Sequence, residues 1–159
     1  MRFVLDASIG LAWFVDTPMD PYAGQVERTM RAGAIAIVPQ LWPLEIANGF
    51  LTVLRRGAFS REAFETALRG VERLLISSIR LDLSTPGPRF AIEIGQQFQL
   101  TAYDAVYLEL ARREGVPLAT LDKELGAAAK KAGVALLKCV GWRGKIAGKR
   151  GAEQRNLRD

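Results

Sequence analysis

The sequence predicts a three-layer α/β/α domain with a central, mostly parallel sheet of about five strands. Two observations support this fold class. Short apolar runs rich in β-branched residues alternate with longer segments of helical periodicity, which is typical of βαβ units around a parallel sheet. The length of 159 residues and the 49% share of hydrophobic residues suit one compact domain with a single core.

The expected elements follow one another in regular alternation. The strands are expected at residues 3–5, 34–38, 79–83, 117–119 and 134–137. The helices are expected at residues 8–15, 20–32, 41–55, 61–75, 89–97, 102–114 and 123–132. Glycines such as Gly115 and Gly133 follow helical segments directly, where a left-handed residue often ends a helix.

The net charge of +5 is concentrated near the C-terminus. Residues 143–159 contain six basic and two acidic side chains, which leaves only +1 for the rest of the chain. We therefore expect a domain over residues 1–142 and a basic, flexible tail over residues 143–159. The tail is either an electrostatic arm for RNA or a solvated terminus.

The residue types that are missing restrict the possible chemistry. The sequence contains no histidine and a single cysteine, Cys139. Histidine-based catalytic pairs, histidine-ligated zinc and intrachain disulfides are therefore excluded. Hydrolytic chemistry must rely on carboxylates, hydroxyls, Lys, Arg or Tyr, and carboxylates prefer hard cations such as Mg²⁺ or Mn²⁺.

The apolar runs are too short for a membrane-spanning helix, which needs about 20 apolar residues. The longest of them, residues 35–44, is also interrupted by proline. No secretory leader is recognisable before the first strand. We therefore expect a cytoplasmic protein that does not associate with a membrane.

Two aspartates follow expected strands directly. Asp6 ends the run Phe3 to Leu5, and Asp122 follows the run at residues 117–121. Ligands of open parallel sheets bind beyond the carboxyl ends of the strands, so both acids face the functional edge. Each of them also precedes a helix, and capping of that helix is the alternative role.

Two further acids lie within expected helices. Glu45 shares a polar stripe with Asn48 and Thr52, so a solvated surface position would also explain it. Asp104 lies on a face that continues with Leu108 and Ala111, where an ionised carboxylate is costly unless it is paired or binds a cation. First-turn capping is the alternative for Asp104.

Four segments carry a resemblance to a known family. They read VLDAS at residues 4–8, PQLWPLEIAN at 39–48, TAYDAVYLELA at 101–111 and PLATLDKEL at 117–125. Each segment alone is a weak signal, but all four in this order make a specific combination. The chain resembles PIN-domain ribonucleases, in particular the VapC-like toxins of type II toxin–antitoxin systems, over nearly its whole length up to Trp142.

The resemblance implies that the protein is a metal-dependent ribonuclease. It implies an acidic catalytic and metal-binding pocket of Asp6, Glu45, Asp104 and Asp122, with Ser8, Asn48 and Thr120 as polar neighbours. It also implies an RNA substrate, Mg²⁺ or Mn²⁺ as cofactor, a homodimer and a small antitoxin that covers the pocket. The long basic tail departs from the family pattern.

The phosphate backbone of RNA would need cationic side chains near this negative pocket. Candidates from the sequence are Arg55, Arg56, Arg112 and Arg113, although a solvated surface charge is the simpler explanation for each of them.

Three other functions stay open at this point. A haloacid-dehalogenase-like phosphohydrolase would carry a second Asp two residues after the first, and Ser8 occupies that position. The other two are a PIN-domain nuclease of housekeeping RNA processing and a catalytically inactive PIN-like binding module.

Overall fold

The computed structural model describes residues 1–84 and 86–138. Within these ranges the chain forms one parallel sheet of four strands in the order β3-β2-β1-β4. The strands are β1 (Arg2–Leu5), β2 (Ile35–Pro39), β3 (Ile79–Asp82) and β4 (Leu118–Ala119). The α/β fold class expected from the sequence is confirmed, and each of these strands lies within one residue of its expected bounds.

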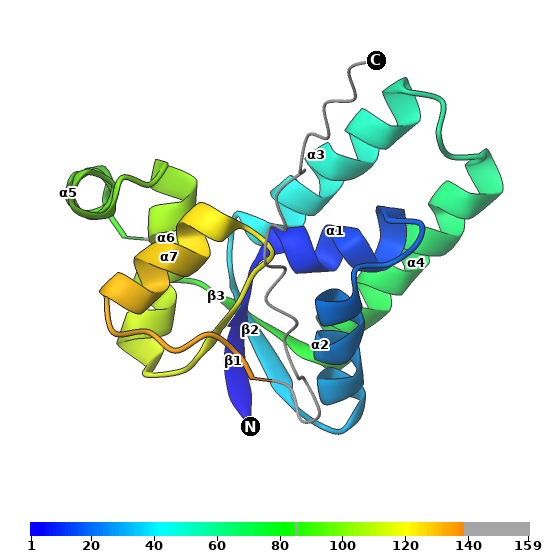
Figure 1. The fold of residues 1–159 in the computed structure, drawn as a ribbon. Helices are drawn as coiled ribbons and strands as arrows, with labels where there is room; N and C mark the ends of the chain where they lie inside the picture. Colours follow the sequence, from blue (N-terminus) through cyan, green and yellow to red (C-terminus); the bar gives the residue numbers. More distant parts are fainter. Residues whose placement is uncertain (85, 139–159) are drawn as a thin grey trace, which may run out of the picture.

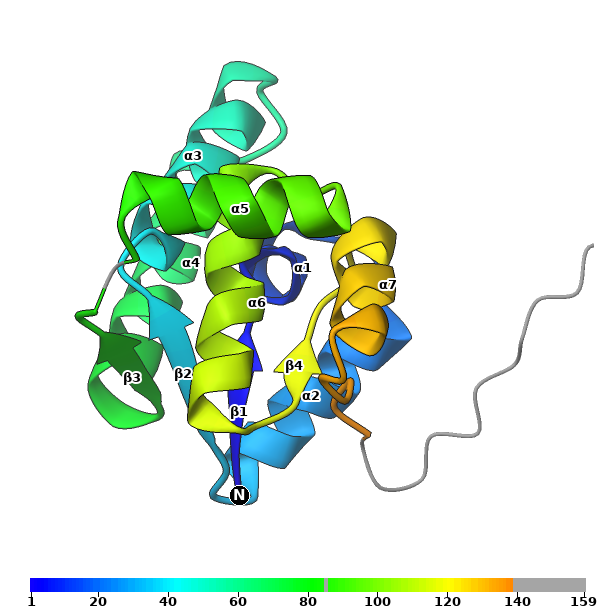
Figure 2. The ribbon, with the colours of Figure 1, turned by 90° about the vertical axis from the view of Figure 1, so that its left-hand side faces the viewer.

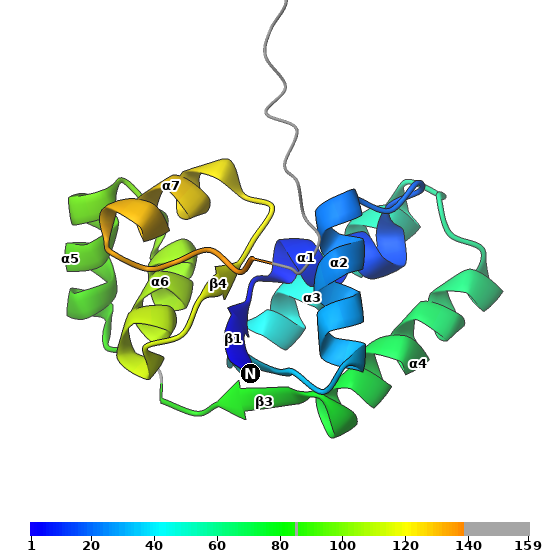
Figure 3. The same cartoon turned by 60° about the horizontal axis from the view of Figure 1, so that its bottom comes forward.

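Helices cover both faces of the sheet. They are α1 (Ala7–Val15), α2 (Pro21–Arg31), α3 (Trp42–Arg55), α4 (Arg61–Ser77), α5 (Pro88–Phe98), α6 (Ala102–Glu114) and α7 (Lys123–Lys131). Figures 1 and 3 show α1 to α4 on one side of the sheet and α5, α6 and α7 on the other. All seven agree with the expected helices to within two residues at each end.

The expected fifth strand at residues 134–137 is the one element that the structure corrects. Leu136 forms only an isolated parallel bridge to Leu118. Val134 and Leu137 are nevertheless buried, because this segment packs into the core. The apolar pattern thus indicated burial correctly, but β4 has only two residues and leaves too little edge for a longer ladder.

The core lies on both faces of the sheet: α6 runs along one face (Figure 2), and buried residues of α1 to α4 pack on the other. Phe3, Val4 and Leu5 of β1 are fully buried, as are Tyr107 and Leu108 of α6. Strands buried on both faces are expected to be continuously apolar, which is why β1 and β2 lack the polar alternation of half-exposed strands.

Close contact between α1 and α3 depends on glycine. A Cβ atom added to Gly10 would lie 2.8 Å from Cζ2 of Trp42, whose side chain is fully buried. A Cβ atom added to Gly49 would overlap the side chain of Leu11. The two helices therefore meet at a spacing that larger residues at these positions would not allow.

Two expectations from the sequence concern residues outside the described ranges: the basic tail at 143–159 and the domain boundary at 142.

No helix in the described ranges is both long and apolar enough to cross a bilayer.

Candidate active site

The parallel sheet directs several chain segments to one edge. Asp6 follows the last residue of β1, and α3 begins shortly after β2. Asp122 follows β4 and precedes α7. The carboxyl ends of parallel strands meet at the same edge, which is where open α/β sheets bind ligands.

Asp6 is buried and held by two hydroxyl groups. Only 6% of the residue is exposed, and its side chain makes no capping hydrogen bond to α1. Ser8 Oγ and Thr120 Oγ1 both donate to Asp6 Oδ2, at 2.5 Å and 2.6 Å. The capping alternative for Asp6 therefore does not describe its side chain.

Backbone amides fix the direction of both hydroxyl protons. Ser8 Oγ accepts the N–H of Leu121 at 3.0 Å, and Thr120 Oγ1 accepts the N–H of Asp122 at 2.9 Å. A hydroxyl has only one proton, and each of these protons is directed at Asp6. The loop after β4 and the start of α1 thus form one hydrogen-bond network around the carboxyl group of Asp6.

Glu45 lies in the first turn of α3 and faces α6. It accepts a short hydrogen bond from the hydroxyl of Tyr107, which is fully buried in α6. Tyr107 was not among the residues singled out from the sequence. Its position three residues after Asp104 places both on one side of α6, and that spacing was the only available signal.

Asp104 is the third acid of this edge. Thr101 is the N-cap of α6 and accepts the backbone N–H of Asp104 at 3.1 Å, while its hydroxyl donates to Asp104 Oδ2 at 2.6 Å. This reciprocal arrangement resembles a capping box, with Thr101 rather than Asp104 as the capping residue. Asp104 therefore has a local structural role as well as its place near the other acids.

The electrostatics show that Asp6, Glu45 and Asp104 are neighbours. Burial raises the pKa of Asp6, and the charge of Asp104 raises it further, although the hydroxyls of Ser8 and Thr120 oppose the shift. Burial also raises the pKa of Glu45, and the charges of Asp6 and Asp104 add to this. Like-charged carboxylates held close together favour proton uptake or a bound cation.

The pKa of Tyr107 is also raised above its usual range. The main causes of this raised pKa are burial and the hydrogen bond to Glu45, followed by the negative charges of Glu45 and Asp6. The Tyr107 hydroxyl therefore keeps its proton and can donate it to the Glu45 carboxylate.

Asp122 is placed differently from the other three acids. Its side chain caps α7 by accepting the N–H of Leu125 at 2.8 Å. It is not among the charges that raise the pKa of Asp6 or Glu45. The structure thus gives Asp122 the capping role named as its alternative, and its role as a metal ligand stays a prediction.

Asn48 lies one helical turn after Glu45, and both residues line a cavity of about 340 Å³.

Of the arginines considered as RNA contacts, Arg113 forms ion pairs with Asp82, Glu109 and Glu114. Its charge is therefore compensated within the protein, which removes it as a free phosphate contact. Arg55, Arg56 and Arg112 are exposed, and their role stays a prediction.

The possible metal ligands at this edge of the sheet are carboxylate and hydroxyl oxygens, and hard divalent cations prefer such oxygen ligands. Within residues 1–84 and 86–138, however, no three His, Cys, Asp or Glu side chains stand in an arrangement that could hold a metal ion. Glu45, Asp104 and Asp122 instead bond to Tyr107, Thr101 and Leu125. The residues fit a cation chemically, but one that bound all of them would replace some of these hydrogen bonds.

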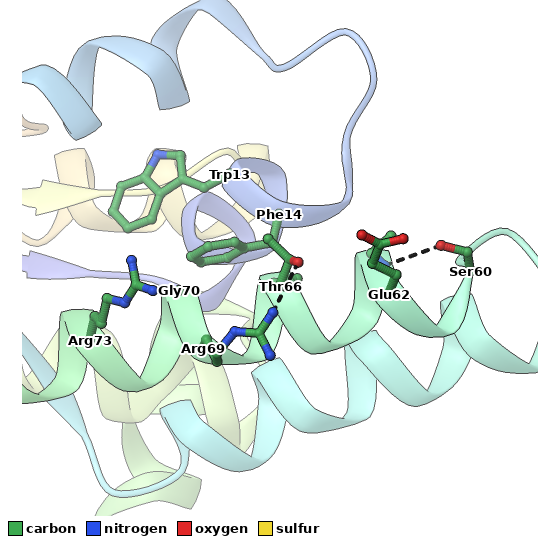
Figure 4. A pocket seen from close by; sticks show the side chains of 10 residues that line it. Trp13, Phe14, Ser60, Glu62, Thr66, Arg69, Gly70 and Arg73 are labelled. Atoms are coloured by element: carbon green, nitrogen blue, oxygen red, sulfur yellow. Dashed lines mark hydrogen bonds between the residues drawn. The ribbon is translucent and has the colours of Figure 1, made fainter.

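A larger groove of about 760 Å³ lies between α1 and α4. Figure 4 shows Trp13 and Phe14 on one wall and Arg69 and Arg73 on the other. None of the four predicted acids lines it. We therefore place the candidate active site at the edge of the sheet and not in this groove.

The chain is thus a parallel α/β domain with an acidic cluster beyond its strands, and comparison with known proteins assigns its class. The model of the family described as "PIN domain" matches residues 3–131. The chain belongs to the PIN domain family. PIN domains are in general nucleases that act on RNA and typically bind divalent metal ions.

Comparison with solved structures finds similar chains of low sequence identity. PAE2754 from Pyrobaculum aerophilum is 22% identical with a TM-score of 0.61, over 80% of this chain and 84% of that one. A domain of a functionally unknown protein from Methanocaldococcus jannaschii is 14% identical with a TM-score of 0.48, over 99% of both chains. The PilT N-terminus domain protein SSO1118 from Sulfolobus solfataricus is 14% identical with a TM-score of 0.40, over 86% of both chains. No curated protein matches the sequence.

Proposed function

We propose that this PIN domain is a divalent-metal-dependent endoribonuclease that hydrolyses phosphodiester bonds of RNA. Asp6, Glu45 and Asp104 are the proposed metal ligands, and Asp122 completes the site directly or through water. Mg²⁺ or Mn²⁺ is the proposed cofactor, because the ligands are hard oxygen donors. When bound, such an ion supplies Lewis acidity toward the phosphate and activates water for attack.

The observation that carries this proposal is the electrostatic coupling of three acids from three separate elements. Asp6 follows β1, Glu45 belongs to α3 and Asp104 to α6, yet the charge of Asp104 raises the pKa of Asp6, and the charges of Asp6 and Asp104 raise the pKa of Glu45. A domain that only needed to fold would gain nothing from this repulsion. An acidic cluster at the ligand-binding edge of a parallel sheet is better explained by a cation that offsets it.

The surrounding residues prepare the acids for this role. The hydroxyls of Ser8 and Thr120 occupy one oxygen of Asp6 and thereby orient its carboxyl group. Tyr107 lowers the pKa of Glu45 relative to what burial alone would give, and so favours the ionised form that binds a cation. These are positioning roles, because each hydroxyl acts through a carboxylate.

We also propose that the chain acts as the toxin of a toxin–antitoxin pair, as a homodimer inhibited by a small antitoxin. The support for this finer assignment is the resemblance of its four motifs to VapC-like toxins. Co-expression with a small adjacent open reading frame, followed by co-purification, tests the partner. Mass measurement in solution tests the homodimer.

The decisive experiment compares Asp6→Asn and Asp104→Asn with the wild type. RNA with unpaired loops is incubated with each purified protein in Mn²⁺ and in EDTA, and growth is followed when each is expressed alone. The wild type should cleave RNA in Mn²⁺ only and arrest growth, while both variants should do neither. Asparagine keeps the shape of aspartate but removes the charge that binds the cation.

Two further variants separate catalysis from helix capping. Asp20 caps α2 by accepting the N–H groups of Tyr22 and Ala23, away from the acid cluster, so Asp20→Asn is the matched control with full activity. Asparagine and aspartate cap helices about equally well. Asp122→Asn should therefore stay active if that residue only caps α7, and lose activity if it completes the metal site. Metal-dependent cleavage by both Asp6→Asn and Asp104→Asn would refute the proposed active site.

A further inference from the structure

A cavity of about 340 Å³ adjoins the acidic cluster, because Glu45 forms part of its lining. One wall consists of the N-cap residue Leu41 and a single face of α3, on which Leu44, Glu45 and Asn48 follow at helical spacing. Tyr103, from the first turn of α6, lines the cavity from the other helix. Its volume lies within the range of about 300–1,000 Å³ found for small-molecule sites.

Two large apolar side chains of this cavity are left exposed to water. Leu44 is 73% exposed and Tyr103 is 66% exposed. Neither side chain contributes to the core, whereas their neighbours Ile46 and Ala105 are buried. One exposed apolar residue is ordinary, but two from different helices on one cavity beside a charged site are typical of a ligand site.

Asn48 adds a hydrogen-bonding group to this apolar slot. Its side-chain amide has no hydrogen-bond partner in the described part of the chain and is exposed to solvent. An amide offers a donor and an acceptor side by side. This pattern matches the N6 and N7 atoms of adenine, with which asparagine forms a bidentate pair.

We propose that this cavity binds one unpaired nucleobase of RNA next to the phosphate to be cleaved, with adenine as the best fit. Tyr103 stacks on the base, Leu44 contacts it from α3, and Asn48 forms hydrogen bonds with its edge. This rests on the proposed function, since it places the substrate at the acidic cluster.

The charge distribution favours a base over other occupants. Glu45 lines the cavity, and Asp6 and Asp104 are close enough to raise its pKa. A phosphate placed here would be repelled, whereas a nucleobase is neutral and presents a flat apolar face. A protein partner or a second copy of the chain that covers Leu44 and Tyr103 is the competing occupant.

Binding of short, labelled, unpaired oligonucleotides to the full chain in EDTA tests the proposal without cleavage. Tyr103→Ala should weaken binding of oligo(A) by about 5- to 150-fold, which corresponds to about 1–3 kcal/mol per stacked base. Tyr103→Phe should restore most of this affinity, because it keeps the ring. Phe90→Ala is the matched control, since Phe90 is a 40%-exposed aromatic residue of α5 outside the cavity.

Asn48→Asp tests which base is preferred. A carboxylate has lost the amide donor to N7 of adenine, but it can accept from the N4 amino group of cytosine. The ratio of oligo(A) to oligo(C) affinity should therefore fall in this variant. An unchanged ratio would contradict the role of Asn48.

Mapping of cleavage positions in Mn²⁺ separates this proposal from the proposed function. If the wild type binds oligo(A) through Tyr103 but cleaves no RNA, the base site stands and the nuclease proposal fails. If the wild type cleaves RNA while Tyr103→Ala binds and cuts at the same positions with the same affinity, the base site is overturned. If Tyr103→Ala changes the oligomeric mass but not the binding of RNA, this surface is a protein interface, and the base site is also overturned.

Discussion

The hydrogen bond from Tyr107 to Glu45 allows a prediction with a defined size and pH dependence. In Tyr107→Phe the ring still fills its fully buried position, so only the hydroxyl is lost. A hydrogen bond to a charged acceptor contributes about 1.5–3 kcal/mol. Glu45 is half-buried and can take up water in exchange, so we expect a loss near the lower end, about 1.5 kcal/mol, or roughly 3–6 °C in melting temperature.

The sign of the pH dependence follows from the partner's charge. The Tyr107 hydroxyl lowers the pKa of Glu45, so removing it raises that pKa further. The bond stabilises the folded state mainly where Glu45 is ionised, and the loss in Tyr107→Phe should grow as pH rises through the pKa of Glu45. Metal binding needs the carboxylate, so its midpoint should also move to higher pH.

Thermal melting at pH 4.5 and pH 8, together with calorimetric Mn²⁺ titrations over the same range, measures both effects. Tyr103→Phe removes an exposed hydroxyl and should leave the melting temperature unchanged at either pH. An equal loss of stability for Tyr107→Phe at both pH values would refute a bond to ionised Glu45. An unchanged melting temperature would show that the bond contributes nothing.

Three further predictions concern the same region. Without metal, Asp6→Asn should be more stable than the wild type at pH 7, by about 1.4 kcal/mol for each unit by which folding raises the pKa of Asp6. Urea unfolding should show that wild-type stability falls as pH rises above the ordinary pKa of Asp6, and that this part of the slope is missing in the variant. Millimolar Mn²⁺ should raise the wild-type melting temperature, because a ligand at a hundredfold excess over its Kd stabilises the folded state by about 2.7 kcal/mol. Identical melting curves in Mn²⁺ and in EDTA would count against a metal site. Gly10→Ala should destabilise by about 1–2 kcal/mol, because overpacking against Trp42 costs more than the helix propensity it gains, whereas Gly24→Ala, which meets only ordinary contacts, should be neutral or stabilising.

The elements of the fold could be predicted because their signals are local. The helix at residues 102–114 was expected with the bounds that the structure shows, since Thr101 caps its start and Gly115 ends it with a φ of 61°. The segment at residues 134–137 misled because its apolar residues are buried without forming a ladder. Burial and strand pairing produce the same pattern in a sequence, and only the neighbouring strand decides between them.

The candidate site could be predicted only where topology decides. Asp6 was found because the end of a parallel strand is a functional position. Tyr107 could not be found in this way, because its partner Glu45 lies 62 residues away in the sequence. No local pattern indicates that α6 faces α3. Asp122 illustrates a third case, since an acid after a strand and before a helix looks the same whether it caps the helix or binds a metal.

The glycine contact between α1 and α3 also determines how the acidic cluster responds to its own repulsion. Asp6 immediately precedes α1 and Glu45 lies in the first turn of α3, so the spacing of these two helices limits how far the two carboxylates can separate. The helices cannot slide past each other without displacing Trp42, which is fully buried against Gly10. Uptake of positive charge, as a proton or as a cation, relieves the repulsion between two like charges that are held in this way. The affinity of the pocket for cations is therefore partly a property of interior packing, and substitutions at Gly10 or Gly49 should alter it although neither residue reaches the pocket.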